Sequence, residues 1–229
     1  MPPIIVRPPL QTHSQYYFLE IDMRFSTVLP ALVVAATGAA ATSNFSTASI
    51  ASAGSLTAKN YYGAPTPPWK AGHHPGWYYG KGSPPQGIPC LLDNLFCDLL
   101  KLIPWGYQCP SLPPPPPPSP PHTPPPPPKY PQTDGFYDLK CAAQDDYSYL
   151  TYGLVDTVEY CEAMCDSVAG CVFINTYHDV NGKNGSPQLT CALFSKCLTA
   201  ASADNCGGQS QPDGSIDYIT NSNGYCKKY

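Results

Sequence analysis

The chain has 229 residues and a net charge of −4, and only 12% of its residues are charged. Nucleic-acid binding needs a basic surface, so this composition argues against a nucleic-acid partner. The 30 prolines and 11 cysteines indicate instead an extended segment and a disulfide-linked fold from an oxidising compartment. No cofactor is expected.

The first hydrophobic run follows a second methionine, in "MRFSTVLPALVVAATGAAATSNFS". Residues 23–41 read as a signal peptide, because Arg24 precedes a short apolar core and Ala39–Ala41 forms an A-x-A cleavage site. The alternative, a retained membrane anchor, is disfavoured because the run is shorter than the ~20 apolar residues that span a bilayer. Residues 1–22 are expected to be a gene-model extension before a start at Met23.

The mature chain is therefore expected to be extracellular, with the cell wall as a further expected location, and to lack an integral membrane span. Asn44 and Asn184 begin glycosylation sequons, although Pro187 after the second disfavours its use. Residues 42–59 are rich in Ser, Thr and Ala and are expected to be disordered.

Residues 60–109 form an aromatic, cysteine-containing segment with an amphipathic helix predicted near 91–103. Apolar residues recur there at helical spacing before Pro104: Leu92, Leu95, Phe96, Leu99, Leu102 and Ile103. This stripe docks on the C-terminal domain, a second copy or another surface, or it closes a small unit of its own.

Three cysteines, Cys90, Cys97 and Cys109, fall in this segment, so at least one has no partner within it. In a secreted chain, an odd cysteine indicates a free thiol or an intermolecular bond, which makes a disulfide-linked dimer one expectation.

His73 and His74 are adjacent, so their side chains point apart in extended structure, and no third ligand lies nearby. A metal site is therefore not expected. The neighbouring Trp77, Tyr78 and Tyr79 are suited to stacking on sugar rings.

Residues 110–133 form a linker, since the stretch 110–131 alone holds 15 prolines. Proline fixes φ and removes backbone donors, so this segment is expected to be a polyproline II spacer. Ser111, Ser119 and Thr123 are candidate O-glycosylation sites.

Residues 134–229 read as a small acidic domain, with 12 Asp and Glu against 5 Lys, a net charge of −7. A helix is predicted over 157–168, with Asp156 and Glu159 as a capping-box-like start and Cys161 and Cys165 on one face. Residues 171–178 alternate as a strand, "NGKNG" forms a turn, and 188–195 return as its antiparallel partner. The predicted fold class is α+β, with one helix on an antiparallel sheet after a largely disordered, Pro-rich N-terminal half.

Zinc is the competing interpretation of Cys161 and Cys165, but the C-x3-C spacing lacks the C-x2-C pairs of structural zinc sites, and secreted thiols oxidise. Calcium is disfavoured in "DVNGKNG", because Lys183 stands where an oxygen ligand belongs and Thr190 where the closing Glu belongs. Disulfides without metal are therefore expected.

The C-x3-C helix, the following "CVF" strand and the later "TCALF" resemble the core of the PAN/apple family over residues 139–227. This resemblance implies four bonds: Cys141 with Cys226, Cys161 with Cys191, Cys165 with Cys171, and Cys197 with Cys206 as an extra bond. The stretches "NTYHDVNGKNGSPQLTCALFSKC" and "NCGGQSQPDGSIDYITNSNGYCKK" further resemble secreted fruit-body-specific proteins of mushroom-forming fungi, which implies a fungal, secreted protein.

Enzymatic activity is not expected, because His178 is the only histidine after the linker and no G-x-S-x-G or H-E-x-x-H motif occurs. Asp138, Asp145 and Asp146 read as solvated acidic loops rather than as catalytic carboxylates.

The leading hypothesis is a secreted binding protein, because the resemblance to PAN/apple domains implies protein or carbohydrate ligands. The candidate contact residues, which have the core as their alternative location, are Tyr147, Tyr149, Tyr152 and Tyr177. The alternative function is a structural component of the cell wall or extracellular matrix, assembled through disulfides and the Pro-rich segment. A hydrophobin-like coat is disfavoured because no Cys-Cys doublet occurs.

Overall fold

The computed structural model describes residues 46–85, 87–102, 107–112 and 127–228. These residues belong to one compact unit, Phe45–Tyr229. The expected extension 1–22, the signal peptide 23–41 and the sequon at Asn44 lie outside the described residues, as do the side chain of Asn184 and most of the Pro-rich linker.

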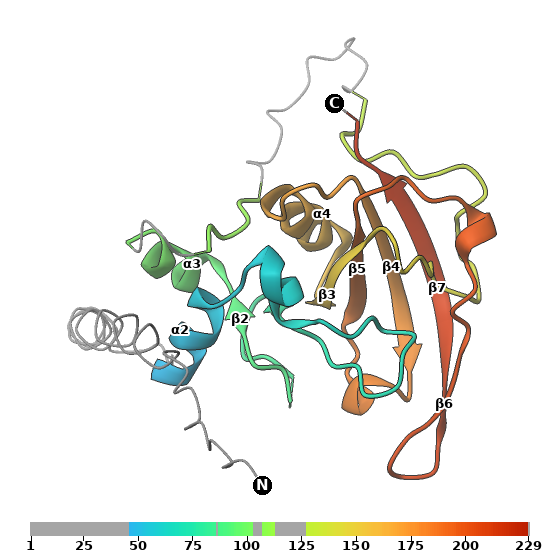
Figure 1. Cartoon of the computed structure of the whole chain (residues 1–229), viewed down its shortest axis with the longest axis horizontal. Coiled ribbons are helices and arrows are strands. Elements are labelled where there is room, and N and C mark those ends of the chain that lie inside the picture. The colour runs from blue at the N-terminus through green and yellow to red at the C-terminus, as the bar shows by residue number, and fades with distance from the viewer. Residues whose placement is uncertain (1–45, 86, 103–106, 113–126, 229) are drawn as a thin grey trace, which may run out of the picture. The chain divides into compact units, whose positions relative to one another are not determined.

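The described residues form a mixed seven-stranded sheet with the strand order β2-β1-β3-β5-β4-β7-β6 (Figure 1). The strands are β1 Tyr78–Tyr79, β2 Leu91–Leu92, β3 Tyr149–Val155, β4 Phe173–Val180, β5 Leu189–Phe194, β6 Gly207–Ser210 and β7 Ile216–Cys226. The α-helices are α2 Thr47–Gly54, α3 Asn94–Leu100 and α4 Val158–Ser167, and the 3-10 helices are η1 Ala58–Gly63, η2 Lys183–Gly185 and η3 Ala200–Ser202. β1 runs parallel to β2 and β3, and the other pairs are antiparallel.

The predicted hairpin is confirmed as β4 and β5, which pair from Phe173 opposite Phe194 to Tyr177 opposite Thr190. The chain turns between them through two residues in the left-handed region, Asn181 at φ 66° and Lys183 at φ 50°. β4 is nevertheless buried on both faces from Phe173 to Tyr177, because further segments cover each side of the sheet.

The predicted helix is confirmed as α4, and Cys161 and Cys165 are fully buried on it. Its N-cap differs from the prediction, since the side chain of Thr157 accepts the hydrogen bond from the Tyr160 N–H at 3.4 Å. Asp156 is turned away from the helix, and its carboxylate accepts from the Tyr78 hydroxyl and the Lys81 N–H instead. The local pattern therefore predicted the helix but misplaced its cap by one residue.

The predicted α+β class is confirmed, but the predicted arrangement of one helix on an antiparallel sheet is wrong, because the sheet is mixed and includes strands from the N-terminal segment. Residues 46–59, expected to be disordered, form α2 and the start of η1. β1 pairs with β3, and the Leu154 N–H donates to the Trp77 carbonyl at 3.0 Å. The physical reason is burial of large aromatic side chains, because Trp77, Tyr78 and Tyr79 are at most 1% exposed.

The predicted helix at 91–103 is shorter in the structure, because Leu91–Leu92 pairs as β2 and Asp93 then caps α3. The Asp93 carboxylate accepts from the Phe96 N–H at 2.6 Å. Phe96 and Leu100 are buried, whereas Leu95 and Leu102 are exposed, and Ile103 lies outside the described residues. Part of the apolar stripe therefore packs in the same unit as the C-terminal sheet.

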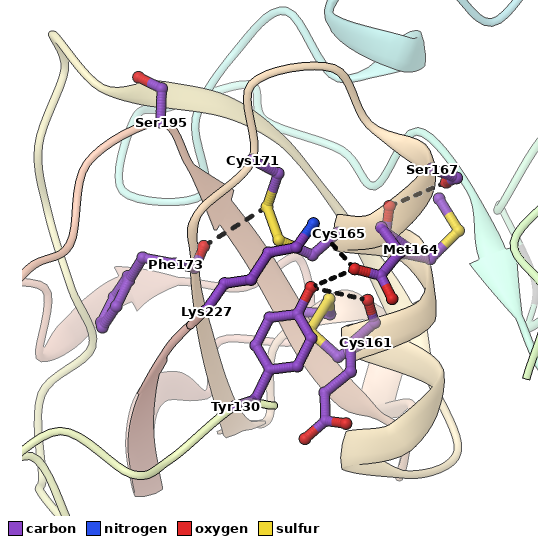
Figure 2. The surroundings of a disulfide bond; sticks show 12 residues. Tyr130, Cys161, Met164, Cys165, Ser167, Cys171, Phe173, Ser195 and Lys227 are labelled. Carbon is purple, nitrogen blue, oxygen red and sulfur yellow. Dashed lines mark hydrogen bonds and ion pairs between the residues drawn. A yellow bond between two sulfur atoms is a disulfide. The ribbon is translucent and has the colours of Figure 1, made fainter. Parts of the chain in front are cut away.

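Five disulfides join the described cysteines: Cys97–Cys109, Cys141–Cys206, Cys161–Cys191, Cys165–Cys171 and Cys197–Cys226. Cys161–Cys191 ties α4 to β5. Figure 2 shows Cys165–Cys171 at the end of α4, beside Tyr130 and Lys227, which both reach the carboxylate of Asp166.

The structure corrects two of the pairings that the family resemblance implied, because Cys141 bonds to Cys206 and Cys226 to Cys197. Ala142 and Asn205 exchange two backbone hydrogen bonds as an antiparallel bridge. This bridge places Cys141 directly opposite Cys206 and so decides the pairing.

Candidate binding site

The four tyrosines predicted as ligand contacts do not form one surface. Tyr147 is fully exposed, whereas Tyr149, Tyr152 and Tyr177 are buried in an aromatic cluster with Phe173. They are covered because β3 and β4 are central strands, and the segment around Ala64 and Trp69 packs over that face. For these three residues, the core was the correct alternative.

His73 is one of the groups that cover this face. Its Nδ1 lies 2.9 Å from the Tyr152 hydroxyl, and its Nε2 lies 2.9 Å from Oε1 of Gln209, so both ring nitrogens are occupied. Burial and the nearby charge of Lys183 lower the pKa of His73, so the ring is neutral near pH 7. His74 is exposed, and no group of three His, Cys, Asp or Glu side chains in the described ranges is placed to hold a metal.

The turn between β4 and β5 carries its own buried cation. Lys183 forms an ion pair with Asp179, and both side chains are almost fully buried. Gly182 is required beside this pair, because a Cβ there would lie 2.2 Å from Oδ1 of Asp179. Lys183, the residue that argued against a calcium site in the sequence, thus lies directly beside the Asp179 carboxylate. Because both side chains are almost fully buried, the pair is not open to a ligand.

An open pocket lies instead where β1, β2 and β3 end. These three strands run in the same direction, so the residues that follow them meet at one edge of the sheet: Gly80, Asp93 and Asp156. The register aligns them, because Tyr79 pairs with both Leu92 and Val155. α3 and α4 each begin directly after this edge.

The pocket has a volume of about 230 Å³. It is lined by three segments, Gly80–Gly82 after β1, Asp93–Leu95 at the start of α3, and Tyr160 on α4. Gly80 must lack a side chain, because a Cβ would lie 2.4 Å from the Tyr78 hydroxyl and 2.5 Å from Oδ2 of Asp156. The sheet edge therefore builds a small cavity whose lining includes two glycines and one aromatic side chain.

Hydrogen bonds fix both carboxylates at this edge. The Tyr78 hydroxyl donates to Oδ1 of Asp156 at 2.7 Å, and the Lys81 N–H donates to Oδ2 at 2.9 Å. Oδ1 of Asp93 accepts from the Phe96 N–H, whereas its Oδ2 has no partner among the described residues. Of these two carboxylates only Asp93 lines the pocket, and Lys81 lines it as well.

Tyr160 is the aromatic wall of the pocket and was not among the residues singled out from the sequence. Its ring packs edge-on against Tyr79, with centroids 4.7 Å apart, and the residue is only 7% exposed. Its hydroxyl has no hydrogen-bond partner among the described residues. Burial raises the pKa of Tyr160, and the carboxylates of Asp156 and Asp93 raise it further, so both charges act at this hydroxyl.

The sequence did place aromatic residues near a sugar site, at Trp77, Tyr78 and Tyr79, but all three are buried. The only local signal for Tyr160 is that it directly precedes Cys161 on the predicted helix and lies off the face that carries the two buried cysteines. The pocket could not be found this way because β1 and β2 have two residues each, too few to show a strand period.

No protein-family model, curated protein or solved structure matches this chain significantly. The resemblance to the PAN/apple family therefore stays a prediction.

Proposed function

We propose that this chain is a secreted, non-enzymatic binding protein that takes up its ligand, a carbohydrate or a group on a protein of the cell surface or matrix, in the pocket at Tyr160. The observation that carries the proposal is the pocket of about 230 Å³, whose lining combines the aromatic side chain of Tyr160 with the carboxylate of Asp93 and the backbone at Gly80 and Gly82. An aromatic side chain beside a few placed polar groups is the usual composition of a site for a small ligand group.

Two further features support an extracellular role. Five disulfides are typical of proteins from oxidising compartments, and a signal peptide is predicted over 23–41. Within the described residues, no helix has the length and apolarity needed to cross a membrane.

The test is binding of the purified full chain to insoluble cell-wall polysaccharides and to a panel of soluble oligosaccharides. Tyr160→Phe removes only the hydroxyl and should weaken binding about three- to tenfold, the usual worth of one hydrogen bond. Tyr147→Phe changes a fully exposed tyrosine outside the pocket and should leave binding unchanged. Equal binding by both variants, or no binding by the parent protein, would contradict the proposal.

The alternative function, covalent assembly into a wall or matrix, draws less support from the odd cysteine. Cys90 is the free cysteine among those described, it is fully buried, and burial raises its thiol pKa to about 12. A buried, protonated thiol is a poor nucleophile for an intermolecular bond. We therefore expect a monomer on a non-reducing gel, and disulfide-linked multimers would favour the structural role.

A further inference from the structure

We infer that His73 is an acid-sensitive latch, whose protonation releases the loop of residues 70–74 from the aromatic face of the sheet. None of the residues of this loop lines the Tyr160 pocket, so the latch is independent of the proposed ligand site.

His73 is the side chain that anchors this loop. The other four residues of the loop are exposed, whereas His73 is partly buried. Within the described chain, the loop has one other side-chain bond to a distant residue, the ion pair of Lys70 with Asp146, in which both side chains are half exposed. Exposed ion pairs contribute little to stability, so the loop is held mainly through His73.

The partners of the two ring nitrogens fix the neutral tautomer of His73. Oε1 of Gln209 can only accept, so the Nε2–H donates to it at 2.9 Å. Nδ1 therefore accepts from the Tyr152 hydroxyl, also at 2.9 Å. A proton on Nδ1 would remove this acceptor and leave the proton of the fully buried Tyr152 hydroxyl without a partner among the described residues. Loss of a partner in a buried position costs free energy, so acid weakens the anchor.

A second cation lies close to the imidazole. The Lys183 ammonium is 5.8 Å from the centre of the Tyr152 ring, and the His73 ring is centred 6.0 Å from the same point. Protonated His73 would therefore place a second positive charge beside Lys183 over one tyrosine ring.

The charged groups around the ring come from several elements and do not all act in the same direction. Burial lowers the pKa of His73, and the charge of Lys183 in the β4–β5 turn lowers it further. The hydrogen bond to Gln209 on β6 and the carboxylates of Asp179 on β4 and Asp217 on β7 raise it. The pKa nevertheless stays below its ordinary value of 6.5, because burial is the largest effect.

This lowered pKa gives the latch its direction. A proton binds His73 more tightly when the loop is open than when it is closed, so closure is strongest above pH 6.5 and weakens as the pH falls. At pH 5 the equilibrium constant for opening rises at most about thirtyfold, since each pH unit below 6.5 contributes at most a factor of ten. Acid thus uncovers the Tyr152 hydroxyl, which the closed loop keeps buried.

Two NMR measurements on the full chain test the latch. The ring of His73 should titrate below pH 6.5. The amide of Gly76, directly after the loop, donates to the Tyr152 carbonyl at 3.1 Å and reports opening through hydrogen exchange. After correction for the intrinsic exchange rate, this amide should be about three- to thirtyfold less protected at pH 5 than at pH 7.5.

Three variants isolate the imidazole. His73→Gln keeps a neutral side chain that can donate and accept, so the Gly76 amide should lose its acid response. His74→Gln changes the adjacent, exposed histidine and should keep the response. Gln209→Glu places a carboxylate at Nε2 and stabilises the imidazolium, so the Gly76 amide should become better protected at pH 5 than at pH 7.5.

Titration of His73 at or above pH 6.5, or equal protection of the Gly76 amide at both pH values, would overturn the latch. An acid response retained in His73→Gln would assign it to another group and overturn the role of His73. If His73→Gln does not fold, the titration of the parent and the response of Gln209→Glu still decide, because an unreversed response in Gln209→Glu contradicts the latch.

Discussion

Gly153 on β3 shows how a single residue positions the N-terminal segment. The indole of Trp77 lies directly on it, and a Cβ there would come within 2.2 Å of two ring carbons. The indole N–H donates to the Thr151 hydroxyl at 3.1 Å, so the ring has little freedom to move. β1 follows Trp77 immediately, and the residues directly after β1, Gly80–Gly82, line the pocket.

Gly153→Ala should therefore destabilise the protein by about 1–3 kcal/mol, the usual cost of overpacking a core. Urea unfolding would measure it as a lower midpoint. Gly54→Ala, at the end of α2 with nothing within 4 Å of the added Cβ, is the control. It should be neutral or slightly stabilising, because alanine favours helix. An unchanged midpoint for Gly153→Ala would contradict the packing of Trp77 on β3.

At the scale of elements, α4 carries an acidic face toward the C-terminal end of the chain. Asp166 pairs there with Lys129. It also pairs with Lys227 and accepts from the Tyr130 hydroxyl (Figure 2). Glu162, one turn earlier, is half-buried and has no ion pair among the described residues. Burial raises the pKa of Glu162 to about 7, and the charges of Glu159 and Asp166 add to the increase.

The raised pKa of Glu162 makes the stability of the folded protein depend on pH with a definite sign. Between its usual pKa of 4.5 and about 7, Glu162 holds its proton more tightly in the folded than in the unfolded state. Its contribution to stability is therefore present at low pH and is lost as the pH rises through 7. Relative to the parent, the free energy of unfolding of Glu162→Gln should therefore increase by about 1 kcal/mol between pH 4 and pH 8. This figure is reduced for the solvent screening of a half-exposed group.

The measurement is Tm of the parent and the variant at both pH values. Asp204→Asn, an exposed carboxylate elsewhere on the surface, is the control and should shift Tm equally at both. A difference for Glu162→Gln that does not change with pH would contradict the raised pKa.

At the scale of the whole molecule, the disulfides join segments far apart in the chain. Cys141–Cys206 closes a loop with a sequence separation of 65, against 6 for Cys165–Cys171. In the loop-entropy account, the long loop contributes about 4.3 kcal/mol to stability and the short one about 2.4 kcal/mol. The long bond is therefore expected to matter more.

Replacing both Cys141 and Cys206 by Ser should accordingly lower the free energy of unfolding more than replacing Cys165 and Cys171. Urea unfolding of the two double variants compares them directly. A peptide map without reduction should also recover Cys141 joined to Cys206, whereas a Cys141–Cys226 peptide would support the family pairing instead.

The sequence predicted the elements whose signal is local. Cys161 and Cys165 on α4, and the alternation through β4 and β5 around "NGKNG", repeat over enough residues to reveal a helix and a hairpin. The pairing of Cys141 with Cys206 has no local signal, since it depends on a bridge between Ala142 and Asn205. The same holds for Tyr160, whose role depends on residues some 70 positions earlier in the chain.

By itself, the sequence determined the acidic, disulfide-rich character of the chain, α4 and the β4–β5 hairpin, because periodicity and turn chemistry act between near neighbours. Only the tertiary structure decided that the N-terminal segment joins the sheet through β1. It also decided which cysteines meet and where a pocket opens. These features arise where parallel strands from distant segments end together, and burial of Trp77, Tyr78 and Tyr79 is the physical cause that brings those segments into register.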